Sequence, residues 1–293
     1  MQNLKYWIVH ICRFFYSFIR HRPAYYKKVK TWGLRQSEDT SPKVIVSLTS
    51  FPARIRTVSY TIESLLSQEY KPDKVVLWLA ESQFPRKSKQ LPRKLLALQE
   101  YGLTIKWTSD IRSYKKLIPS LKEFPEDIIV TTDDDVYYRP DWLKKLYTSY
   151  LLDKNAIHCH RAHLIKLDNY GNISPYNKWG NETVRGPYQG FDILMTGVGG
   201  VLYPPHVLYK DSTNESIFYS IAKNADDIWF WAMAVLQHTK INVVADNDSD
   251  CDPVFIIRDE SLWDINQGGN NDIVIANLYG YYPQIKKILT NEL

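Results

Sequence analysis

The sequence predicts an α/β protein built on a largely parallel sheet, and three observations support this prediction. Short β-branched runs alternate with segments of helical spacing between residues 44 and 132, which is the pattern of βαβ units. The run that ends at Thr132 is followed by Asp133, Asp134 and Asp135, so a buried strand delivers carboxylates to a sheet edge. A chain of 293 residues with 44% apolar and 14% aromatic residues can bury a full core.

Strands and helices are expected in alternation along the first half of the chain. The β-branched residues from Val44 to Thr49 favour a strand, and apolar residues at Val58, Ile62 and Leu65 then follow with helical spacing. The same reasoning predicts, in order, a strand at 44–49, a helix at 57–68, a strand at 75–79, a helix at 91–100, a strand at 104–107, a helix at 113–123 and a strand at 128–132.

Polar side chains follow the expected strand ends and are predicted to line one crevice. In such sheets, ligands bind beyond the carboxyl ends of the strands, at a switch point in strand order. The residues placed there are Thr49, Arg54, Glu81, Asp110 and Asp133 to Asp135. No Gly-x-Gly-x-x-Gly follows the first strand and no Gly-Lys-Ser/Thr loop occurs, which argues against dinucleotide-binding and P-loop proteins.

The aspartate triplet has two interpretations. An isolated Asp-Asp-Asp is more often a solvated acidic turn, but adjacent carboxylates repel, and a bound cation or a strong pKa shift would explain why they are kept together. A second acidic pair, Asp226 and Asp227, opens a later apolar segment of helical character, where the structural alternative is a helix N-terminal pair. The two acidic sets together favour a two-carboxylate site.

The second half of the chain contains segments typical of binding loops. Gly197-Val198-Gly199-Gly200 permits unusual backbone angles and the close approach of a ligand, although an ordinary tight turn is the alternative. His158, His160, Arg161 and His163 form a basic cluster. We favour contacts of this cluster with an acceptor or a diphosphate over a zinc site, and satisfied core histidines remain an equal alternative.

The N-terminal segment is expected to be a basic arm, separable from the rest of the chain. Apolar residues share one face of a helix over residues 4–19, but charged residues interrupt the run, which is too short to span a membrane. We expect residues 4–22 to bind the surface of a membrane, with packing on protein as the alternative. The expected division is an arm at 1–34, a linker at 35–43 and a catalytic domain at 44–293, with halves at 44–140 and 141–293.

Charge and cysteine usage restrict the class of partner and the compartment. The net charge of +5 is small and dispersed, so no nucleic-acid interface is expected. Cys12, Cys159 and Cys251 are odd in number and widely spaced, which indicates neither a disulfide framework nor a zinc site. A reducing compartment fits this pattern, so we expect a cytoplasmic protein bound peripherally to the inner face of the cell membrane.

Four segments in this order resemble the nucleotide-diphospho-sugar transferases of the GT-A fold. They are the run Val46 to Arg54, the triplet Asp133 to Asp135, the segment Gly197 to Gly200, and Ala225-Asp226-Asp227-Ile228-Trp229. The resemblance covers about Val44 to Trp231 and is closest to the family 2-like glycosyltransferases of bacterial surface-polysaccharide synthesis, which include lipopolysaccharide and capsule enzymes. It implies a GT-A fold, with a mostly parallel sheet flanked by helices behind an amphipathic N-terminal helix.

The resemblance also implies roles for individual residues. Asp133 and Asp135 would be the outer members of an Asp-x-Asp motif that binds Mn²⁺ or Mg²⁺, while Asp227 would be the catalytic base, with Asp226 as the second candidate. The residues implied to contact the nucleotide or the donor sugar are Thr49, Phe51, Arg54, Asp110, Lys116, Asp133, Asp134, Gly199 and Gly200. A structural ion pair is the alternative for Arg54, and a solvated helix face is the alternative for Lys116.

The activity that the resemblance implies is metal-dependent transfer with inversion. A single sugar would move from a nucleotide-diphosphate sugar, with UDP-sugars favoured, to a hydroxyl of a glycan or lipid-linked glycan acceptor. Two family features have no evident counterpart: a metal-binding His after Asp227, and the Gln-x-x-Arg-Trp motif of processive synthases. The alternatives are a sugar-phosphate nucleotidyltransferase, which usually carries a glycine-rich phosphate loop that this chain lacks, and a non-catalytic carbohydrate-binding protein.

Overall fold

The computed structural model describes residues 32–36, 42–179, 184–247, 252–254 and 269–292. The amphipathic arm expected at residues 4–22 lies outside the described residues, as does most of the 1–34 segment. Among the helices in the described ranges, none combines the length and the apolar character needed to cross a bilayer.

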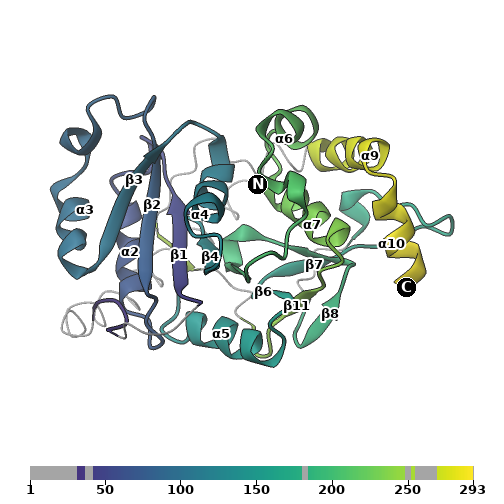
Figure 1. Cartoon of the computed structure of the whole chain (residues 1–293), viewed down its shortest axis with the longest axis horizontal. Coiled ribbons are helices and arrows are strands. Elements are labelled where there is room, and N and C mark those ends of the chain that lie inside the picture. The colour runs from purple at the N-terminus through teal and green to yellow at the C-terminus, as the bar shows by residue number, and fades with distance from the viewer. Residues whose placement is uncertain (1–31, 37–41, 180–183, 248–251, 255–268, 293) are drawn as a thin grey trace, which may run out of the picture.

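The core of the fold is a mixed sheet of eight strands (Figure 1). The strands are β1 (Val44–Thr49), β2 (Lys74–Ala80), β3 (Leu103–Thr108), β4 (Ile128–Thr132), β6 (Ile157–Cys159), β8 (Tyr188–Gly190), β10 (Val201–Tyr203) and β11 (Ile241–Val243). Their order is β3-β2-β1-β4-β10-β6-β11-β8. β3, β2, β1 and β4 are mutually parallel, β10 and β8 run in the opposite direction, and β6 and β11 run with the first four. The predicted, mostly parallel α/β sheet is therefore confirmed.

Helices cover both faces of this sheet (Figure 1). Side chains of Val44, Val46 and Leu48 point from β1 into a core formed with α2 (Val58–Leu66), α3 (Arg93–Ala97) and α5 (Trp142–Leu152). Ile45 points to the other face, where the core includes α4 (Ile118–Glu123), α6 (Glu215–Ala222), α7 (Asp226–Leu236), α9 (Asn271–Tyr281) and α10 (Gln284–Glu292). This alternation of burial along one strand is what a sheet buried on both faces requires.

Two short two-stranded sheets complete the half of the chain that follows β4. β5 (Val136–Tyr137) pairs with β12 (Asp252–Pro253), and β7 (Ala162–Leu164) pairs with β9 (Ile193–Met195). The pairing of β7 with β9 brings the segments around residues 161 and 196 next to each other. At this point Thr196 N donates a hydrogen bond of 2.9 Å to the Arg161 carbonyl. These segments form one wall of the cavity described below.

The helix predicted at 113–123 is in fact two segments. A 3₁₀ helix, η4, covers Arg112–Lys116, and α4 begins at Ile118. Pro119 lies in the first turn of α4, where its missing N–H costs no intrahelical hydrogen bond, so a new helix starts there. The break matters for the site because both Lys115 and Lys116 lie at the end of η4 and are buried.

Candidate active site

A cavity of about 900 Å³ opens where the strand ends of β1 and β4 meet the second half of the chain. Its lining includes Thr49, Ser50, Phe51, Arg54, Gln83, Asp110, Arg112, Lys115, Lys116, Asp133, Asp134, Arg161, His163, Tyr176, Thr196, Lys223, Asp226, Asp227 and Asn271. Of the residues predicted to line one crevice, Glu81 and Asp135 are not in the lining, and Glu81 is exposed and pairs with Lys87 at 2.9 Å. The cavity therefore lies at the switch from the parallel block to the antiparallel strand β10, as expected for such sheets.

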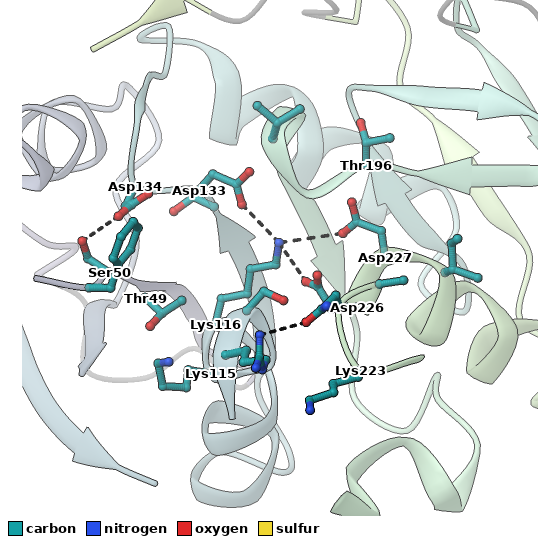
Figure 2. A pocket seen from close by; sticks show the side chains of 18 of the residues that line it. Thr49, Ser50, Lys115, Lys116, Asp133, Asp134, Thr196, Lys223, Asp226 and Asp227 are labelled. Carbon is teal, nitrogen blue, oxygen red and sulfur yellow. Dashed lines mark hydrogen bonds and ion pairs between the residues drawn. The ribbon is translucent and has the colours of Figure 1, made fainter. Parts of the chain in front are cut away.

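Lys116 joins the two acidic sets of the sequence (Figure 2). Its Nζ lies 3.1 Å from Asp133 Oδ1, 3.0 Å from Asp226 Oδ2 and 3.8 Å from Asp227 Oδ1. The Lys116 side chain is only 9% exposed, and the three negative charges raise the pKa of its ammonium against the opposing effect of burial. The ammonium is thus the internal counter-ion of this cluster, and the interpretation of Lys116 as part of a solvated helix face is wrong.

Asp227 faces the cavity from the first turn of α7. Its Oδ2 accepts a hydrogen bond of 3.0 Å from the Gly197 amide, and its Oδ1 lies on the Lys116 side. Burial raises the pKa of Asp227 to about 7, with the charges of Asp226 and Asp133 adding to the rise and Lys116 opposing it. A carboxylate in this range can accept a proton near neutral pH. The N-cap residue of α7 is Ala225, so neither aspartate is the N-cap itself.

The remaining members of the triplet bind Arg54. Asp134 is 6% exposed and accepts hydrogen bonds from Ser50 Oγ at 2.6 Å and from Arg54 Nη1 at 2.8 Å. Asp135 Oδ2 lies 2.9 Å from the same Nη1, and Asp135 is not among the residues that line the cavity. Burial raises the pKa of Asp135 to about 6 despite the opposing charge of Arg54. Arg54 therefore makes the structural ion pairs that were its alternative interpretation, while it also lines the cavity.

Asp110 follows β3 and also lines the cavity. Its Oδ1 accepts a hydrogen bond of 2.6 Å from Lys115 Nζ, and its Oδ2 accepts one of 2.9 Å from Gln83 Nε2. Lys115 and neighbouring backbone and side-chain donors lower the pKa of Asp110, although burial opposes them. Thr49 and Phe51 line the same cavity, and the guanidinium of Arg54 lies over the Phe51 ring at 5.5 Å from its centroid.

The glycines of the segment Gly197 to Gly200 lie next to the cavity but do not line it. Gly197 supplies the amide that binds Asp227, but Gly199 and Gly200 are buried and are not among the lining residues. The Gly199 carbonyl accepts a hydrogen bond of 2.8 Å from Trp142 Nε1. Gly200 has φ +89°, and a Cβ there would overlap the Trp142 ring.

Replacing Gly200 with Ala should therefore destabilise the protein. The backbone conformation is costly for an L side chain, and Trp142 is 1% exposed and cannot easily move away. The strained backbone and the overpacking against Trp142 should together lower the free energy of unfolding by roughly 2–5 kcal/mol. Urea denaturation of both proteins measures it. Gly269→Ala is a weaker control, because its φ is also positive at +95° but no atom lies within 4 Å of the added Cβ; equal losses would show that the Trp142 contact is unimportant.

The basic cluster at 158–163 divides between the core and the cavity. His158 bonds Ser149 Oγ at 2.9 Å and the Asp153 carbonyl at 2.8 Å, and both His158 and His160 have no exposed surface. His160 Nε2 bonds the Trp142 carbonyl at 3.0 Å, so these two are satisfied core histidines, and neither lines the cavity. Arg161 and His163, in contrast, line the cavity.

Several cavity residues were not anticipated from the sequence. Ser50 holds Asp134, Lys115 holds Asp110, and Thr196 and Tyr176 line the wall opposite the strand ends. Ser50 and Lys115 each neighbour a residue that the sequence had already singled out, so adjacency was an available signal. For Tyr176 the signal was only compositional: it lies between Gly171 and Gly190, a stretch whose Gly, Asn, Pro and Tyr content is typical of binding loops, and the structure places it in a short 3₁₀ helix, Tyr176–Lys178.

The charge balance of the site fits a divalent cation. In the described residues, Asp134 and Asp135 pair with Arg54, and Asp133, Asp226 and Asp227 pair with Lys116, so carboxylates outnumber cations in both groups. Among the described residues, no three His, Cys, Asp or Glu side chains form a complete metal site. Mg²⁺ and Mn²⁺ are commonly bound by one or two carboxylates together with substrate phosphates. The carboxylate best placed for this is Asp133, which lines the cavity and is 31% exposed.

The chain matches no protein-family model and no curated protein sequence. Its structure is similar to solved transferases. A mannosyltransferase, PcManGT from Pyrobaculum calidifontis, solved with GDP-Man and Mn²⁺, has a TM-score of 0.46 at 13% identity over 97% of this chain and 84% of that one. TarS from S. aureus has a TM-score of 0.42 at 10% identity over 71% of this chain and 59% of that one.

A nucleotidyltransferase is similar to the same degree. The inositol-1-phosphate CTP transferase from T. maritima has a TM-score of 0.43 at 11% identity, over 82% of this chain and 97% of that one. The structural neighbours thus include glycosyltransferases and nucleotidyltransferases alike. At these identities and TM-scores, the likeness assigns neither a reaction nor a site residue to this chain.

Proposed function

We propose that this chain is a metal-dependent, inverting glycosyltransferase of the GT-A fold, which moves one sugar from a nucleotide-diphosphate sugar to a hydroxyl of a glycan or lipid-linked glycan. The observation that carries the proposal is the convergence of Asp133, from the end of β4, and Asp227, from the start of α7, on the Lys116 ammonium. The reaction needs one carboxylate near the leaving group and another near the nucleophile. Residues more than ninety positions apart supply both in one cavity.

The donor would lie along the strand ends of the first half. Thr49, Phe51, Arg54 and Asp110 line that side of the cavity and suit the nucleoside, as the sequence resemblance implies, and UDP is the favoured nucleotide. Arg112 and Lys223 also line the cavity and offer positive charge to the diphosphate. We assign the metal to Asp133, with Asp135 as the second carboxylate of the motif. When bound, Mn²⁺ or Mg²⁺ would neutralise charge on the diphosphate leaving group.

The protein residues would then act on the nucleophile. The acceptor hydroxyl oxygen attacks the anomeric carbon as the bond from that carbon to the diphosphate oxygen breaks, and the hydroxyl proton passes to a carboxylate oxygen of Asp227. The Gly197 amide and Lys116 Nζ hold this carboxylate from two sides, which fixes its direction. A single displacement of this kind inverts the anomeric configuration. Asp226 is more enclosed, at 6% exposure, so we assign it to positioning Lys116.

The cellular setting in this proposal rests on the sequence alone. The basic, amphipathic pattern of residues 4–22 suits a peripheral location on the inner face of the cell membrane, where a lipid-linked acceptor would be reached. The resemblance to surface-polysaccharide enzymes suggests the same setting. Binding of the full chain to anionic vesicles, compared with a chain that begins at residue 35, measures the contribution of this arm.

Metal-dependent binding of UDP is the first test of the proposal. We expect Mn²⁺ and UDP together to raise the melting temperature more than the sum of their separate effects, because the phosphates complete the metal shell that Asp133 begins. Asp133→Asn should remove this synergy and lower the affinity for UDP with Mn²⁺ by roughly 10–100-fold.

Two comparisons make this test specific. Asp135→Asn should weaken the synergy less, because Asp135 binds Arg54 and does not line the cavity. Synergy unchanged in both variants would remove the metal assignment. Incubation with a panel of UDP-sugars should release UDP, whereas formation of pyrophosphate from nucleoside triphosphate and sugar phosphate would identify a nucleotidyltransferase instead.

A further inference from the structure

Arg161 is a cation at the cavity wall, and no described residue pairs with it as a carboxylate. It is half-buried, and its Nη1 donates a hydrogen bond of 3.0 Å to Thr196 Oγ1. Across the described ranges, no Asp or Glu forms an ion pair with it, whereas Arg54, Lys115 and Lys116 have carboxylate partners. The other cations of the lining, Arg112 and Lys223, also lack an ion pair in these ranges, and both are assigned above to the donor diphosphate. A guanidinium that lines a cavity without a counter-ion is a candidate site for an anionic group of a ligand.

The position of Arg161 places that anionic group on the acceptor side of the candidate base. In Figure 2, the Lys116 ammonium lies between Asp133 and Asp227, and Thr196 lies next to Asp227. Thr196 precedes Gly197, whose amide binds Asp227, and the same Thr196 binds Arg161. The donor diphosphate is assigned to Asp133, whereas Arg161 is bound to the segment that holds the candidate base, so an anionic group at Arg161 would belong to the attacking molecule.

The surrounding side chains suit a sugar. Asn271 is 5% exposed and lines the cavity, and in the described structure its Oδ1 is buried without a hydrogen-bond partner, so it can accept a bond from a ligand hydroxyl. The Tyr176 ring offers an apolar face beside His163, with the two ring centroids 6.0 Å apart. Burial, and secondarily the charge of Arg161, lower the pKa of His163 to about 4, so this histidine is neutral and leaves Arg161 as the local charge.

We infer that the acceptor carries an acidic group, a phosphate or a carboxylate, which Arg161 binds while Asn271 and Tyr176 hold the sugar ring. This inference rests on the proposed function, because it names the acceptor class of the same site. A planar guanidinium binds either oxyanion with two parallel hydrogen bonds, and bonds of this kind are about twice as strong as neutral ones. Losing them should weaken acceptor binding by roughly 10–100-fold.

Binding of three matched sugars to the full chain saturated with UDP and Mn²⁺ tests this inference. Glucose, glucuronic acid and glucose 6-phosphate differ in charge on the same ring, and their dissociation constants can be measured by ligand-observed NMR. We expect at least one acidic sugar to bind at least about ten times more tightly than glucose. The sugar that binds more tightly of the two then shows whether the acidic group is a carboxylate or a phosphate. Arg161→Gln should abolish the preference, and Arg161→Lys should keep part of it.

Lys166→Gln is the matched control. It removes the same charge two residues beyond β7, at an exposed position that does not line the cavity, and should keep the full preference. Equal affinity for the three sugars, or a preference that survives Arg161→Gln, overturns the inference, as does an Arg161→Gln protein whose main defect is in binding UDP. Release of UDP from UDP-sugars without any acceptor tests the proposed function separately, since it needs neither the acidic sugar nor Arg161.

Discussion

Asp227→Asn should reduce sugar transfer by roughly 10²–10⁴-fold, the usual contribution of a positioned general base. The amide keeps the size of the side chain but cannot take the hydroxyl proton. Binding of UDP with Mn²⁺ should change little, because Asp227 lies on the acceptor side of Lys116 and not next to the expected diphosphate. Steady-state rates of sugar transfer to the acceptor, together with calorimetric affinity for UDP, separate the two effects.

Asp226→Asn is the matched comparison for the base. Asp226 precedes Asp227 in the same helical turn but lies against Lys116 at 3.0 Å with 6% exposure. Its variant should lose stability and keep a larger share of the rate. If Asp226→Asn loses the greater part of the rate while Asp227→Asn stays active, the assignments of base and positioning residue are reversed.

Lys116→Met should cost about 3 kcal/mol in the free energy of unfolding, because it leaves a buried cluster of carboxylates without its central cation. This loss is at the lower end of what is typical when one partner of a buried ion pair is removed, because the side chains of Asp133 and Asp227 are 31% and 36% exposed and water screens their charges. Only Asp226, at 9% side-chain exposure, is left fully dependent on Lys116. Urea denaturation without metal measures the loss, and Mn²⁺ should restore part of it.

The loss should depend on pH in a definite direction. The folded-state pKa of Asp227 is raised to about 7, and removing the opposing charge of Lys116 raises it further. A raised carboxyl pKa means that the ionised form destabilises the folded state, so the deficit is largest at alkaline pH, above the pKa of Asp227 in the variant, and narrows as the pH falls toward about 7, where Asp227 takes up a proton in both proteins. A deficit that grows on acidification would contradict this account of the cluster.

Lys115→Met is the matched control for Lys116→Met. Lys115 is the preceding residue and is 3% exposed, but its partner Asp110 is 33% exposed and also bonds Gln83 and the Arg112 amide. Asp110 therefore retains other donors after the substitution, and the loss should be smaller, about 1 kcal/mol. Comparable losses for both variants would show that burial of the lysine stem, rather than the carboxylate cluster, decides the cost.

The fold class was predictable because it depends on local patterns. β-Branched runs and helical spacing placed β1, β2, β3 and β4 to within about two residues, and their alternation implied parallel pairing. The second half was harder, because its strands are three residues or shorter and return in antiparallel order beside β4. Such short strands carry too little periodicity to identify, and long-range pairing determines them.

The acidic positions of the candidate site were also predictable from the sequence. Carboxylates at the end of an apolar strand and at the start of an apolar helix are visible without coordinates, and Asp133 and Asp227 do line one cavity. Lys116 was also singled out, as a residue that contacts the donor or lies on a solvated helix face, but its role as the counter-ion of the carboxylates was not predicted. The break between η4 and α4 turned it inward, and that break depends on how Pro119 is accommodated in the folded chain.

By itself, the sequence determined the fold class, the strand ends and the residue types that reach them, because these follow from local propensity and spacing. The tertiary structure alone decided which charges meet: that Asp133, Asp226 and Asp227 share one ammonium, that Arg54 binds Asp134 and Asp135, and that Arg161 has no acidic partner in the described structure. The physical reason is that ion pairing depends on distances of a few ångströms between segments far apart in the chain, and spacing along the sequence does not specify these distances.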